Sequence, residues 1–141
     1  MKTAIIYATM SGHSKKIAQA ISKELNLQAY NIKENPAINE YDLLFVVSGI
    51  YGGGCSPQLL EWAKNLSQQQ VKSVALITSS MSNLPQKALR DTLCANGIIV
   101  KEKEYLCVGS FLFMKLGHPN KSEIASAIEF AKETMKDCNS K

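Results

Sequence analysis

The sequence predicts a doubly wound α/β domain, a three-layer sandwich around a five-stranded parallel sheet of order 2-1-3-4-5. Continuous apolar runs, typical of strands covered on both faces, alternate along the chain with patterns of helical period. Right-handed crossovers between parallel strands place helices on both faces of the sheet. In sheets of this class a ligand binds beyond the carboxyl ends of the strands, where the strand order reverses.

The first half of the chain supplies three strands and one helix. The apolar run at residues 3–8 predicts a buried strand, and the periodic residues 15–25 predict a helix. Residues 27–32 alternate like a shorter strand, and the continuous apolar run at 42–48 predicts a central one. Residues 33–41 leave room only for a single short turn between them.

The second half continues the alternation. Ser56-Pro57 is a strong helix start, with serine as N-cap and proline at the first helical position. Residues 71–78 predict the next strand and residues 85–95 a helix, which Asn96-Gly97 ends.

The last two elements are a strand and a helix. Residues 103–109 predict the final strand of the sheet. Asn120 and Glu123 have capping-box spacing and precede a helical pattern of apolar residues. The chain of 141 residues thus fits one domain that spans residues 1–141.

Composition excludes several classes of protein. The four cysteines are scattered, which argues against a disulfide scaffold or a zinc site and fits reduced thiols in the cytoplasm. No apolar stretch is long enough to cross a bilayer, and no signal-peptide pattern is present. The net charge is +4 with dispersed lysines, which favours acidic partner proteins rather than nucleic acid.

Three polar loops follow neighbouring strands of the predicted sheet, at residues 9–14, 49–56 and 79–84. The first joins a strand directly to a helix, where free backbone N–H groups and the helix dipole favour a phosphate. Gly12 allows close approach of the backbone, and hydroxyl groups add donors. The alternative is an ordinary strand-to-helix turn whose serine and threonine residues serve only as caps.

The second loop places an aromatic ring among glycines. Tyr51 could stack on a planar heterocycle, or it could be a plain surface aromatic beside a tight bend. A phosphate at one end and a planar ring at the other describe a mononucleotide-like ligand. No residue is assigned a catalytic or metal-ligating role.

The run ATMSGHS resembles the phosphate loop of flavodoxins, written (S/T)-x-T-G-x-T, with serine for threonine at two positions. The segments YDLLFVVSGIYGGGCSP and GSFLFMKLGHPNKSEIASAIEFAK also resemble short flavodoxin-domain proteins. The resemblance covers nearly the whole chain. It implies a flavodoxin-like fold, noncovalently bound FMN, and electron transfer between redox partner proteins.

The resemblance also assigns the cofactor site. Residues 9–14 would hold the phosphate, and residues 50–53 and 79–81 would flank the isoalloxazine ring. The expected cofactor-binding residues are Thr9, Met10, Ser11, Gly12, His13, Ser14, Ser48, Gly49, Ile50, Tyr51, Gly52, Gly53, Ser79, Ser80 and Met81. Flavodoxins of this type are generally acidic with an acidic third loop, whereas this chain is basic. Fewer negative charges near the ring predict a less extreme reduction potential.

The sequence lacks the motifs of other enzyme and nucleotide-binding classes that are built on similar sheets. The first loop has neither the Cys and Arg of a low-molecular-weight phosphatase nor the lysine of a Walker A motif, and only one glycine of G-x-G-x-x-G. Two alternatives stay open. One is an FMN-dependent NAD(P)H:quinone-type reductase, and the other is an interaction module that keeps the fold without a flavin.

Overall fold

The computed structural model describes residues 2–8, 13–49, 57–80, 87–108 and 121–139. Strands and helices alternate along the chain as the sequence predicts. The elements are β1 (Thr3–Tyr7), α1 (His13–Leu25), β2 (Gln28–Asn31), η1 (Ile32–Glu34), β3 (Tyr41–Gly49), α2 (Pro57–Lys64), β4 (Val71–Ser80), α3 (Lys87–Ala95), β5 (Ile99–Val100), β6 (Tyr105–Val108) and α4 (Lys121–Asn139).

The sheet has the order β2-β1-β3-β4-β5, and β6 also pairs with β4. Every one of these pairings is parallel. The predicted order 2-1-3-4-5 and the flavodoxin-like fold class are thereby confirmed. The longest pairing joins β3 and β4 and extends from Tyr41↔Val71 to Gly49↔Ser79.

The fifth position of the sheet differs from the prediction, because two short strands share it. Val100 of β5 pairs with Val74 of β4, and Tyr105 of β6 pairs with Ile77 of β4. Between these two pairs the chain advances by three residues along β4 but by five residues along the edge formed by β5 and β6. The extra residues lie in the charged connection at 101–104. The predicted strand at 103–109 corresponds to β6. The two residues of β5 are too few to show any periodicity in the sequence.

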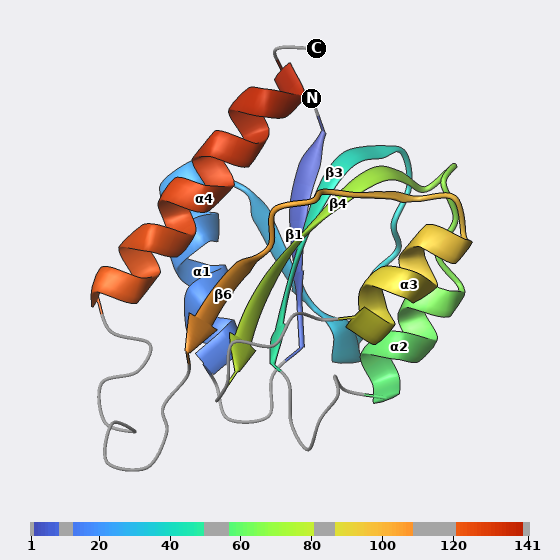
Figure 1. Ribbon diagram of the computed structural model, residues 1–141, viewed down its shortest axis with the longest axis horizontal. Coiled ribbons are helices and arrows are strands. Elements are labelled where there is room, and N and C mark those ends of the chain that lie inside the picture. The colour runs from blue at the N-terminus through green and yellow to red at the C-terminus, as the bar shows by residue number, and fades with distance from the viewer. Residues whose placement is uncertain (1, 9–12, 50–56, 81–86, 109–120, 140–141) are drawn as a thin grey trace.

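Helices cover both faces of the sheet (Figure 1). On one face α1 and α4 pack over a cluster that includes Ile5, Phe45 and Ile77. On the other face α2 and α3 pack over a cluster that includes Leu44 and Leu76. Because neighbouring residues of a strand point to opposite faces, the continuous apolar runs of β1, β3 and β4 supply both clusters.

Local signals set most of the element ends. The short turn predicted after β2 is the 3₁₀ helix η1, which Asn31 and Glu34 close with a capping box. Pro57 is the first residue of α2, as predicted. Strand β4 continues to Ser80, so Ser79 and Ser80 belong to the strand and not to the loop that follows it. None of the helices described is long and apolar enough to cross a membrane.

Candidate functional site

The carboxyl ends of β1, β3 and β4 lie side by side at one edge of the sheet. Tyr7 at the end of β1 pairs with Val47 of β3, and Gly49 at the end of β3 pairs with Ser79 of β4. The amino-terminal ends of α1, α2 and α3 point toward the same edge (Figure 1). The three polar loops predicted to bind a ligand therefore start from adjacent strands.

The structure describes six of the predicted site residues, and all six border this edge. They are His13 and Ser14 at the start of α1, Ser48 and Gly49 at the end of β3, and Ser79 and Ser80 at the end of β4. The remaining predicted residues lie outside the described part of the chain. These are Thr9, Met10, Ser11, Gly12, Ile50, Tyr51, Gly52, Gly53 and Met81.

Ser14 carries the clearest sign of a ligand. Its side chain is 0% exposed, and its Oγ has no hydrogen-bond partner within the part of the chain that the structure describes. A buried hydroxyl left without a partner costs about 1–3 kcal/mol. Ser14 is the second residue of a helix that directly follows β1, where backbone N–H groups also lack partners inside the helix. A phosphate oxygen would satisfy the hydroxyl and the amides together, so the residues present fit this group.

The charges around this edge suit an anion. The first turns of α1, α2 and α3 contain no acidic residue, although acidic residues are favoured at helix starts. Lys15 and Lys16 lie exposed in the first turn of α1. Lys87 opens α3, and its hydrogen bond to Asp91 raises the pKa of the Lys87 ammonium group, which keeps it charged. The helix ends and the two exposed lysines of α1 therefore favour a negatively charged group at this edge.

A partly buried polar cluster beside the end of β4 was not among the residues predicted from the sequence. The Glu104 carboxylate accepts a 2.9 Å hydrogen bond from Thr78 Oγ1 and lies 3.3 Å from Nη2 of Arg90. Thr78 is 0% exposed, and only 6% of the Glu104 side chain is exposed. The three residues come from β4, α3 and the connection between β5 and β6, so no spacing in the sequence marks them.

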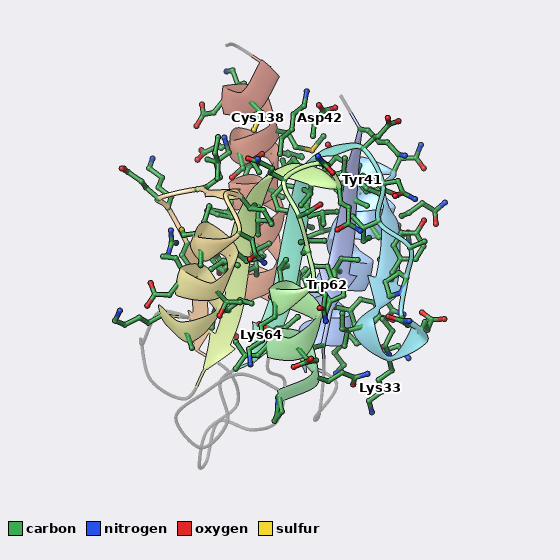
Figure 2. The ribbon with its side chains drawn as sticks, turned by 90° about the vertical axis from the view of Figure 1, so that its right-hand side faces the viewer. Lys33, Tyr41, Asp42, Trp62, Lys64 and Cys138 are labelled. Atoms are coloured by element: carbon green, nitrogen blue, oxygen red, sulfur yellow. The ribbon has the colours of Figure 1, made fainter. Side chains whose placement is uncertain are left out.

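Trp62 lies on α2, the helix that follows the second loop (Figure 2). It is partly buried and packs against the core cluster under α2 and α3. Trp62 is therefore a packing residue.

Comparisons with known proteins agree with this architecture. A family model described as "Flavodoxin domain" matches residues 4–115. An uncharacterised protein of Methanocaldococcus jannaschii is 32% identical over 151 aligned positions, which cover 97% of this chain and 100% of that protein.

Solved structures share the fold at low sequence identity. Oxidised flavodoxin 2 from Bacillus cereus superposes with a TM-score of 0.71 at 17% identity, covering 97% of this chain and 99% of that one. A flavodoxin from the domain Archaea gives a TM-score of 0.71 at 14% identity, with 99% of each chain covered. With a family match over most of its length and the strand order of the fold, this chain belongs to the flavodoxin-domain family.

Proposed function

We propose that this protein binds FMN without a covalent bond and acts as an electron carrier. Membership of the flavodoxin-domain family supports an electron-transfer role of the flavodoxin type. The observation that supports the FMN assignment is the buried Ser14 hydroxyl at the start of α1. It has no hydrogen-bond partner among the described residues, and it lies at a helix end that favours a phosphate.

Different segments of the chain would bind different parts of FMN. Residues 9–14 would hold the phosphate, and residues 50–53 and 79–81 would flank the isoalloxazine ring. The bound flavin supplies one-electron chemistry, and the protein sets its potential through hydrogen bonds and nearby charge. In this proposal the whole chain, residues 1–141, is one domain whose net charge of +4 favours acidic redox partners.

Two variants test the phosphate assignment. Ser14→Ala removes a hydroxyl that would bond a charged oxygen, so we expect the FMN dissociation constant to rise about tenfold. Riboflavin, which lacks the phosphate, should bind both forms equally. Thr3→Val is the matched control, because Thr3 Oγ1 is also buried with no partner in the described ranges but lies at the opposite end of β1. Equal FMN affinity in Ser14→Ala and the wild type would contradict the assignment.

The spectrum of the purified protein decides between the functional classes. A flavin absorption band supports the carrier, and its absence after incubation with FMN favours a flavin-free interaction module. Bleaching of the band by dithionite or a reductase, but not by NADPH alone, is the result expected of a carrier. Rapid bleaching by NADPH alone would instead indicate a reductase.

A further inference from the structure

Glu104 joins two elements that are separated in sequence by the third polar loop. One carboxylate oxygen, Oε2, accepts a 2.9 Å hydrogen bond from Thr78 of β4. The other, Oε1, lies 3.3 Å from Nη2 of Arg90 in the first turn of α3. Thr78 precedes the third polar loop and Arg90 follows it. The Glu104 carboxylate therefore contacts the chain on both sides of that loop.

The interrupted edge of the sheet brings Glu104 to this position. Glu104 lies in the connection between β5 and β6. This connection contains more residues than the part of β4 beside it. Its neighbours Glu102 and Lys103 are exposed, whereas only 6% of the Glu104 side chain is exposed. The carboxylate therefore points inward between β4 and α3.

Partial burial strengthens this link. The Glu104 side chain is 6% exposed and that of Arg90 is 26% exposed, so removing Arg90 leaves the carboxylate charge largely shielded from water, which is unfavourable. Lys87 and Asp91 form a comparison pair on the same helix, with a 2.8 Å contact but side chains 82% and 62% exposed. Such an exposed pair contributes little to stability and does not reach the sheet. Of these two pairs, the Glu104 link is the one that joins α3 to β4.

We propose that Glu104 is a positioning residue for the isoalloxazine ring. By holding Thr78 beside Arg90, it fixes the end of β4 at Ser79 and Ser80, two of the residues proposed to flank the ring. This inference rests on the proposed FMN function and deepens it. Because the phosphate site is at α1, on the opposite face of the sheet from α3, Glu104 acts on ring binding and not on phosphate binding.

Binding measurements with three ligands distinguish an effect on the ring site from an effect on the phosphate site. In Glu104→Gln, the dissociation constants of FMN and riboflavin should both rise about tenfold, since both contain the ring. Binding of inorganic phosphate should stay within twofold of the wild type, and the visible circular dichroism of bound FMN should change. A loss of general stability would instead lower the affinity for phosphate as well. Asp91→Asn, which breaks only the exposed pair, should leave all three affinities unchanged.

A second measurement needs no flavin. In the apoprotein, we expect amide hydrogen exchange between residues 79 and 90 to accelerate about tenfold in Glu104→Gln and in Arg90→Met, but not in Asp91→Asn. The double variant Glu104→Gln/Arg90→Met should resemble the more affected single variant, because both changes break one network.

These results separate the two proposals. Wild-type protein that takes up neither FMN nor riboflavin overturns the proposed function, and with it the role of Glu104 in ring binding. Wild-type protein that binds both, together with a Glu104→Gln variant of unchanged riboflavin affinity, overturns the positioning role alone. Unchanged hydrogen exchange at residues 79–90 in Glu104→Gln also overturns it.

Discussion

The backbone amide of Lys2 donates a 2.7 Å hydrogen bond to Oδ2 of Asp42. This bond joins the residue that precedes β1 to the second residue of β3. Asp42 lies at the amino-terminal edge of the sheet, opposite the candidate site (Figure 2). The hydrogen bond from Lys2 lowers the pKa of the Asp42 carboxyl below its usual value, and Lys72, 3.5 Å from Oδ1, lowers it further.

Asp42→Asn should therefore destabilise the protein in a pH-dependent way. A carboxyl whose pKa is lower in the folded than in the unfolded state stabilises the fold above its unfolded pKa of about 3.9. That contribution is lost as the pH falls through the folded pKa. Because the side chain is 37% exposed, we expect a loss of only about 0.5–1 kcal/mol in the free energy of unfolding at pH 7.

Urea unfolding of wild type and Asp42→Asn at pH 7, 5 and 3 measures this effect. The difference between the two proteins should shrink as the pH approaches 3. Asp91→Asn, which disrupts an exposed pair on α3, serves as the control and should have a smaller effect at pH 7. A difference for Asp42→Asn that stays constant over the whole range would show that the carboxylate charge is irrelevant.

Asn96 connects the end of α3 to the end of α2. Its Nδ2 lies 2.9 Å from the carbonyl oxygen of Ala63, 3.1 Å from that of Lys64 and 2.8 Å from that of Leu66. Ala63 and Lys64 are the last residues of α2, where carbonyls lack N–H partners of the regular helix, and Leu66 lies just beyond it. The Ala63 carbonyl also accepts a 3.2 Å hydrogen bond from the Leu66 amide, so the Asn96 side chain adds to a partly satisfied helix end. Asn96→Ala should lower the free energy of unfolding by about 2 kcal/mol.

Equilibrium unfolding in urea measures this loss. The matched control is Asn65→Ala, which removes a single exposed hydrogen bond to the Glu61 carbonyl and should cost less than about 0.5 kcal/mol. Equal losses in the two variants would mean that the contacts of Asn96 between helices add nothing. Neither variant touches the candidate site.

The end of α3 shows how far the sequence could predict this molecule. Asn96-Gly97 marked the end of the helix correctly, because that signal depends on neighbours in the chain. The partners of Asn96 lie about 30 residues away, and no local pattern indicated them. Ser14 was predicted as a site residue from a local signal too, because it lies in the short polar run that joins a strand to a helix. Glu104 was missed because its burial depends on Thr78 and Arg90, which approach it only in the folded sheet.

Gly97 adopts a φ of +81°, a conformation that L side chains rarely take. A Cβ placed there would lie 3.0 Å from Oε1 of Gln68, the end of an exposed and flexible side chain. The backbone conformation is therefore the larger obstacle. Gly97→Ala should lower the free energy of unfolding by about 1–2 kcal/mol, as thermal or urea unfolding would show.

Two further variants distinguish backbone strain at residue 97 from a steric contact with Gln68. Gly97→Asn should cost less than Gly97→Ala, because asparagine tolerates the left-handed region. Adding Gln68→Ala to Gly97→Ala should restore little stability if the backbone is the cause. Full recovery in that double variant would assign the cost to the contact with Gln68.

The first turn of α2 contains no acidic residue, so a carboxylate introduced there tests how the reduction potential of bound FMN responds to a nearby negative charge. Gln58→Glu adds a carboxylate to that exposed turn, toward the edge where the ring is proposed to bind. A negative charge disfavours addition of an electron, so the midpoint potential of bound FMN should fall. For a separation of about 10 Å in a water-like dielectric, Coulomb's law gives about 0.4 kcal/mol, or about 20 mV for one electron.

Gln69→Glu is the matched control, since it makes the same chemical change at an exposed residue just before β4, at the opposite end of the sheet. Redox titration at low salt should show a shift in Gln58→Glu several times larger than in Gln69→Glu. Raising the salt to about 0.5 M should reduce the difference, because exposed charges are screened over a few ångströms. Equal shifts in both variants would mean that the flavin does not lie near the amino-terminal end of α2.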